Sequence, residues 1–208
     1  RHHLPFCNRR RRENMSTGVD LASFLREGTK TAHNELEEKN ILKSMRATHP
    51  DLKVWLLGYQ AIAVGYRHMA GVICASGFCN NDPRIPDIAA TADAYKRDID
   101  ALSAEGLAVL DEPPAPPALT SPSQTFGAVW CLNGSRYGAR VLLATAEREF
   151  GAQASRYLSG LRQQQTTPPK QKKRRNTAVL APSPQDIEHA EALKGAQATF
   201  AYFTEIAD

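Results

Sequence analysis

The sequence predicts a single-domain, all-α helical bundle, and three observations lead to this fold class. Apolar residues recur at steps of three and four along most of the chain, which is the period of an amphipathic helix. No stretch alternates polar and apolar residues for long enough to indicate a β-strand. The 208 residues, 42% of them hydrophobic, suffice for one domain with its own core. We therefore expect five or six helices.

The first half of the chain predicts three helices. One lies within residues 21–40, and a second carries a three- and four-residue apolar repeat over 52–73. A third covers about 88–105 and ends near Gly106, because glycine commonly terminates a helix. The prolines of residues 111–123 exclude a helix in the connector that follows.

The second half begins with a helix start signal at residues 121–124, where serine, proline, serine and glutamine fit the cap and first turn of a helix. This helix is expected to reach about residue 150, and a short element follows at 152–162. Residues 163–183 form a basic, proline-containing segment that is expected to be a loop. Residues 183–186 supply caps for a final helix.

Positive charge is concentrated at two places, although the formal net charge is only +4. Residues 1–14 are a basic leader, which we expect to be disordered or extraneous to a domain that spans 15–208. Residues 170–175 carry five further cations, and the rest of the chain is acidic to neutral, which argues against a nucleic-acid partner. No run approaches the roughly 20 apolar residues of a membrane span, and the cysteines lack zinc-site spacing, so we expect a cytoplasmic protein without membrane contact.

The first helix carries one charged face that includes a histidine. At about 100° per residue, Arg26, Lys30, His33 and Glu37 fall on one stripe. A neutral histidine can bind a metal ion, and a neighbouring carboxylate can orient its ring. The two cations would suit an anionic ligand. The alternative is a charged helix face that is simply solvated.

Two glycines interrupt the helix predicted after residue 121. Gly134 and Gly138 are four residues apart and therefore share one face, with Ser135 and Ala139 beside them. Interior glycine lowers helix stability by about 1 kcal/mol relative to alanine, so this pair needs an explanation. Either another helix packs closely against the glycines, or a flat ligand approaches the backbone there.

Together the two segments resemble a known family. LREGTKTAHNELE (25–37) and GAVWCLNGSRYGARVL (127–142) are similar to the proximal and distal helices of the haem oxygenases, nearest to the bacterial biliverdin-producing type. The resemblance implies a haem-oxygenase-like fold, with haem sandwiched between the first helix and a kinked distal helix. It implies that His33 is the iron ligand and that Glu37 orients its ring. It also implies that Arg26 and Lys30 face the haem propionates, and that the distal kink is formed by Gly134, Ser135, Gly138 and Ala139.

The implied activity is the O₂- and electron-dependent opening of haem to biliverdin, with release of iron and carbon monoxide. Haem b would be both substrate and cofactor, a reductase or ferredoxin would donate electrons, and a bacteriophytochrome is one candidate acceptor of biliverdin. Ser135 and Asn133 would hold water for proton delivery. The sequence departs from the family at Tyr137, where leucine is common, and in the basic segment.

Two functions other than haem oxygenase fit the same sequence features. A bundle of the same fold that binds haem without turning it over would keep every feature except catalysis. A nucleic-acid- or anion-binding protein would instead use the basic runs, but these contain few aromatic residues for base stacking.

Overall fold

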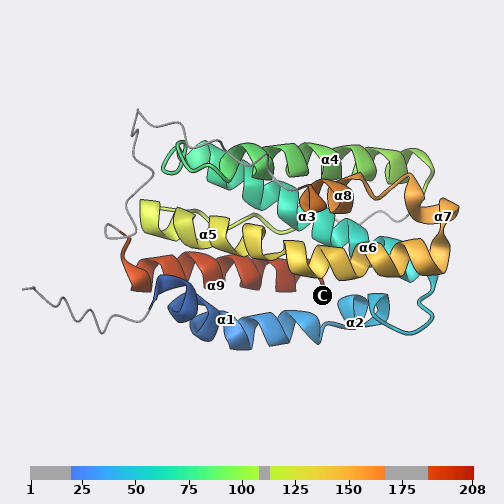
Figure 1. Cartoon of the computed structure of the whole chain (residues 1–208), viewed down its shortest axis with the longest axis horizontal. Coiled ribbons are helices and arrows are strands. Elements are labelled where there is room, and N and C mark those ends of the chain that lie inside the picture. The colour runs from blue at the N-terminus through green and yellow to red at the C-terminus, as the bar shows by residue number, and fades with distance from the viewer. Residues whose placement is uncertain (1–19, 108–112, 167–186) are drawn as a thin grey trace, which may run out of the picture.

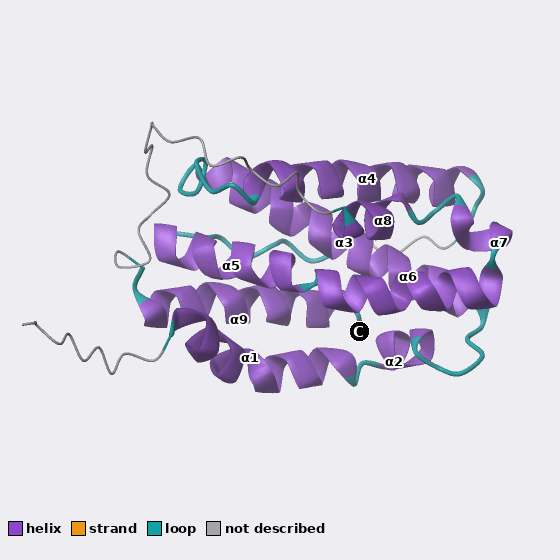
Figure 2. Cartoon of the chain, in the orientation of Figure 1, coloured by secondary structure: helices purple, strands orange, loops and turns teal. Residues whose placement is uncertain are grey.

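A computed structural model describes residues 20–107, 113–166 and 187–208, and the statements that follow concern these residues. They form nine helical segments and no strand, which confirms the prediction of an all-α class (Figure 2). The helices are α1 (Leu21–Glu37), α2 (Asn40–Met45), α3 (Leu52–Ser76), α4 (Ile85–Ala104), α5 (Pro122–Gly134), α6 (Arg136–Phe150), α7 (Ala152–Ser155), α8 (Ser159–Gln165) and α9 (His189–Ile206). Within this part of the chain, none of the helices combines the length and apolarity required to cross a bilayer.

Short-range capping sets where several helices begin. Asp51 precedes α3, and its carboxylate accepts a hydrogen bond from the backbone N–H of Val54 at 3.1 Å. Ser121 precedes α5, its hydroxyl accepts from the N–H of Gln124 at 3.2 Å, and Pro122 occupies the first helical position. The start signal at residues 121–124 is therefore confirmed, because a side-chain oxygen satisfies a helix N–H that has no partner within the helix.

The helices are divided more finely than the sequence predicted. The expected first helix ends at Glu37, and the short helix α2 follows after a turn. The helix predicted to reach residue 150 breaks at Ser135 into α5 and α6, where the glycines were expected to interrupt it. Residues 163–165, predicted to be loop, belong to α8, and the rest of that loop from 167 onward lies outside the described residues. The last helix begins at His189, and its predicted caps at 183–186 also lie outside them.

Helix α9 organises one half of the bundle and α4 the other. Helices α1 and α5 both pack on α9, while α3 and α8 pack on α4, and α8 also contacts α6 (Figure 1). Helices α5 and α9 approach so closely that glycine is required on both. A Cβ atom added to Gly127 would lie 1.9 Å from the Ala192 carbonyl oxygen, and one added to Gly195 would lie 2.0 Å from that of Gln124.

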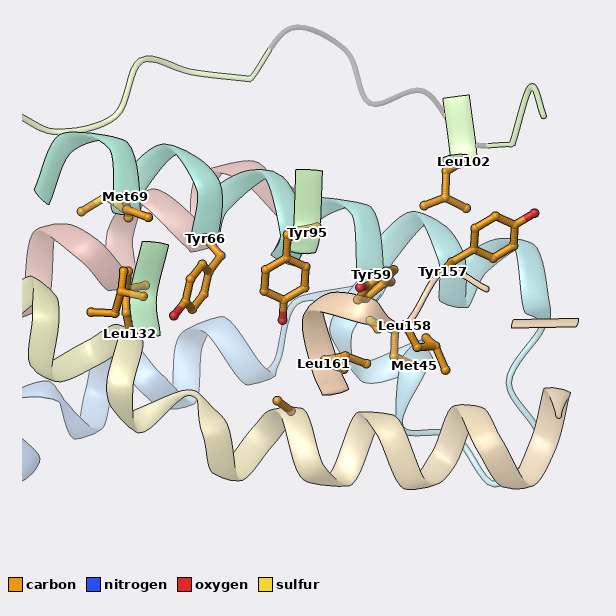
Figure 3. Close-up of a cluster of buried hydrophobic side chains, with 14 of the residues drawn as sticks. Met45, Tyr59, Tyr66, Met69, Tyr95, Leu102, Leu132, Tyr157, Leu158 and Leu161 are labelled. Atoms are coloured by element: carbon orange, nitrogen blue, oxygen red, sulfur yellow. The ribbon is translucent and has the colours of Figure 1, made fainter. Parts of the chain in front are cut away.

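Large aromatic and aliphatic side chains fill the main core, many of them from α3 and α4, and others come from α2, α5, α6 and the residues in and before α8 (Figure 3). Tyr59 and Tyr95 are fully buried, with ring centroids 5.8 Å apart. Asp98 lies among them, where it accepts the hydroxyl hydrogen bond of Tyr59 and that of the Gly160 N–H at 2.7 Å. This carboxylate therefore ties α3 and α4 to the first turn of α8.

Candidate functional site

The charged stripe of α1 lies on the surface, beside the packed face of the helix. Leu25 and Thr29 are buried, whereas Arg26, Lys30 and His33 are exposed, as their helical spacing predicts. The His33 side chain is 52% exposed, and its ring meets the edge of Phe200 on α9 at a centroid distance of 5.5 Å. An imidazole that is held on one side and open on the other remains accessible to a ligand.

The two cations of this stripe have no carboxylate partner among the described residues. Neither Arg26 nor Lys30 forms an ion pair there, whereas most other cations near α1 do. Their charges are therefore available to an anionic group beside His33.

Glu37 is placed differently from the role that the resemblance implied. Its Oε1 lies 3.9 Å from Nδ1 of His33, which is within ion-pair range but beyond a hydrogen bond. The same oxygen lies 3.2 Å from Nη1 of Arg46, a residue that the sequence analysis did not single out. Glu37 is thus shared between the histidine and an arginine, and it would have to rotate slightly to orient the ring directly.

The helix break expected in the distal segment is present at Ser135. The Ser135 hydroxyl donates to the carbonyl oxygen of Leu132 at 2.7 Å, a local bond that bends helices. The hydroxyl also accepts from Nε2 of Gln164 on α8 at 2.8 Å. Because the hydroxyl proton is already used, Ser135 cannot donate it to a water molecule as well.

The glycines on either side of this break face open space. No atom of the described residues lies within 4 Å of a Cβ built on Gly134 or on Gly138. Close helix packing therefore does not explain this pair, whereas it does explain Gly127 on the same helix segment. The backbone of α6 is open at this edge.

Ala139 does not share that edge. It is only 4% exposed and belongs to the core, although the sequence analysis grouped it with the haem-facing residues of the kink. The reason is geometric, because one residue further along the helix turns the side chain by about 100° away from Gly138. The exposed neighbours of the glycine edge are Tyr137 and Val141, at 79% and 55% exposure.

Glu149, further along α6, indicates the direction of the open edge. Glu149 lies within about 20° of Gly138 around the helix, since eleven residues complete three turns. Its carboxylate is 3.2 Å from Nδ1 of His49, which belongs to the segment after α2 (Figure 1). The glycine edge is thus aimed to the same side as this segment.

His33 and the kink lie at a similar position along the axis of α9. Along α9, Gly28 meets Gln197 at 3.0 Å and His33 meets Phe200, so α1 and α9 run in the same direction. Helix α5 also runs alongside, and its Cys131 reaches the carbonyl oxygen of Ala196 at 3.5 Å. The kink at Ser135 follows one turn after Cys131. It therefore lies beside the turn of α9 that contains Phe200, which contacts His33.

A hollow lies on the side of α6 away from the glycine edge. This hollow of about 270 Å³ is lined by Asn133, Arg136, Tyr137, Arg140, Gln164, Gln165 and Thr166. Arg136 and Arg140 each lie two residues from Gly138, which places them about 160° around the helix from it. These arginines, and Asn133 with them, therefore face away from the glycine edge.

No group of three or more histidine, cysteine or acidic side chains within the described ranges could by itself hold a metal ion. A metal at His33 would therefore have to bring most of its own ligands, as a porphyrin-bound iron does. Comparison of the chain with known protein families, curated proteins and solved structures gave no match.

Sequence reasoning missed Arg46, Phe200 and Gln164 as neighbours of the predicted site. Gln164 fell within the predicted loop of residues 163–183, and Arg46 and Phe200 carried no signal of their own. Nothing local marks them, because Gln164 is 29 residues from Ser135 and its role depends on how α8 packs.

Proposed function

We propose that this protein binds haem between α1 and the kinked α5–α6 segment and acts as a haem oxygenase. One combination of features carries the proposal. An accessible histidine on α1 and an open glycine edge on α6 lie at a similar position along α9, and the two cations beside the histidine have no ion-pair partner among the described residues. A flat, anionic, iron-containing ligand uses each of these features.

The residues present fit haem on three counts. Nδ1 of His33 faces Glu37, which leaves Nε2 as the nitrogen for the iron. Arg26 and Lys30 would form charge-assisted contacts with the propionates. The glycine edge of α6 offers a surface without Cβ atoms, where a planar ring can approach the backbone. Bound haem would supply an iron centre at which O₂ is activated.

The chain itself would bind and orient the ligand. His33 holds its position by packing against Phe200, so its ring is pre-oriented on one side. Tyr137 and Val141 flank the glycine edge and would shield part of the porphyrin from water. Gly134 and Gly138 would admit a small ligand on the distal side that larger side chains would exclude.

One observation favours the alternative, a bundle that binds haem without turning it over. The hydroxyl proton of Ser135 is already donated within the kink, and Asn133 lines the hollow on the far side of α6. The two residues expected to hold water for proton delivery are therefore poorly placed to donate protons at the glycine edge.

The test is a haem titration followed by addition of a reductant in air. Wild-type protein should bind haem with the absorption spectrum of a histidine-ligated iron and, as an oxygenase, should then form biliverdin. His33→Ala should lose that spectrum and regain it with added imidazole. His189→Ala is the control, because His189 is a partly exposed histidine that packs against Phe24 at the start of α9, eleven residues before Phe200.

The outcomes separate the alternatives. An unchanged spectrum in His33→Ala would contradict the assignment of the iron ligand. A normal His33-dependent spectrum without biliverdin would favour the non-catalytic haem-binding protein.

A further inference from the structure

The hollow on the far side of α6 has an excess of positive charge. Arg136 and Arg140 lie on successive turns of α6 and both line it. Arg136 is neutralised by an ion pair with Asp87 of α4. Arg140 has no carboxylate partner among the described residues, and its only hydrogen bond there joins Nε to Oε1 of Gln165 at 3.4 Å. One guanidinium charge is therefore left uncompensated at the hollow.

The floor of the hollow is built from glutamine side chains that are already held in place. Gln164 is 3% exposed, accepts from the Tyr95 hydroxyl at 3.2 Å and donates to Ser135 at 2.8 Å. Gln165 donates to the carbonyl oxygen of Arg136 at 3.2 Å. A floor whose carboxamides are fixed by such bonds loses little conformational freedom when a ligand binds.

The size and rim of the hollow limit what it can hold. A volume of about 270 Å³ is just below the usual range for small-molecule sites, so it suits a compact ligand. None of the described residues that line it is acidic, and Tyr137 stands at its edge with 79% of its surface exposed. An aromatic ring at the rim can cover the planar body of a ligand whose charged end reaches the arginine.

We propose that this hollow is a binding site for a small organic oxyanion, a carboxylate or phosphate carried on a planar ring. The guanidinium of Arg140 would bind the anionic group through two parallel hydrogen bonds, a geometry that arginine provides and lysine does not. Arg136 on α6 and Asn133 at the end of α5 would add donors, and Tyr137 would stack on the ring. Tyr137 stands between this hollow and the glycine edge, but the anion-binding arginines lie on the side of α6 away from that edge, and the test requires no haem.

Calorimetric titration of the full chain with phenyl phosphate, benzoate and neutral benzamide tests the proposal at low salt. The two anions should bind in the millimolar range or tighter, and benzamide should bind at least about tenfold more weakly, because a hydrogen bond to a charged group is worth more than a neutral one. The tighter of the two anions identifies the preferred group.

Substitutions locate the binding. Arg140→Ala should weaken binding about tenfold or more, and Arg140→Lys should recover only part of it. Arg97→Ala is the matched control, since Arg97 is exposed on α4 away from the hollow and its loss changes the net charge equally. The proposal is overturned if neither anion binds by about 10 mM, about tenfold above the expected range. It is also overturned if Arg97→Ala weakens binding as much as Arg140→Ala does.

Discussion

Two glycine-to-alanine substitutions give the sharpest test of the open edge on α6. Gly138→Ala adds a methyl group where nothing lies within 4 Å. Gly127→Ala adds the same group 1.9 Å from the Ala192 carbonyl oxygen, on the closely packed α5–α9 interface. Both glycines lie within helices, so replacing either by alanine raises the intrinsic stability of its helix by a similar amount. The difference in unfolding free energy between the two variants therefore reports tertiary packing.

The expected magnitudes have opposite signs. Replacing glycine by alanine in a helix is worth up to about 1 kcal/mol, so Gly138→Ala should stabilise the protein by about that amount or less. At Gly127 the new Cβ would collide with backbone, and overpacking of this kind typically destabilises by about 1–3 kcal/mol or more even after rearrangement. For a chain of this size, about 1 kcal/mol corresponds to a change in Tm of roughly 2–4 °C.

The assay is thermal and urea unfolding followed by circular dichroism, without haem. Gly138→Ala should have an unchanged or slightly raised Tm, and Gly127→Ala should have a Tm lowered by several degrees. If haem approaches the α6 backbone, Gly138→Leu should bind haem more weakly than wild type while its stability without haem stays close to wild type. A Tm that falls equally in Gly138→Ala and Gly127→Ala would refute the reasoning, because it would mean that the edge of α6 at Gly138 is packed.

Two further predictions concern buried carboxylates. Asp98→Ala should lower the free energy of unfolding, measured in urea, by about 3 kcal/mol or more. The reason is that the Tyr59 hydroxyl and the Gly160 N–H lose their acceptor. A loss below about 1 kcal/mol would contradict this role of Asp98. Burial opposes ionisation of Asp82, but hydrogen bonds from the Arg84 side chain and N–H outweigh it and hold the pKa of Asp82 below its usual value. Its contribution to stability should therefore be present above about pH 4 and be lost as the pH falls through the lower folded pKa. Asp82→Asn should flatten this part of the curve of unfolding free energy against pH. An unchanged curve in this variant would contradict the role of the ion pair.

The helices themselves were largely predictable because their determinants are local. The apolar repeat over 52–73 lies within α3, and the cap at Ser121 depends only on residues a few positions away. The shared face of Arg26, Lys30 and His33 follows from helical spacing alone, and the structure places all three on the exposed side. The finer divisions, such as the turn between α1 and α2, were not apparent from periodicity.

The sequence alone thus determined the all-α class, the starts of several helices, the charged face of α1 and an interruption near Gly134. Only the tertiary structure decided which glycines serve packing and which lie open, because Gly127 and Gly138 differ in their neighbours and not in their local sequence. It also decided that Arg140 faces a hollow beside α8, while the glycine edge faces the other way. Helical periodicity fixes the angle between two side chains on one helix, but what each side chain meets depends on elements distant in sequence, which only the packed bundle brings together.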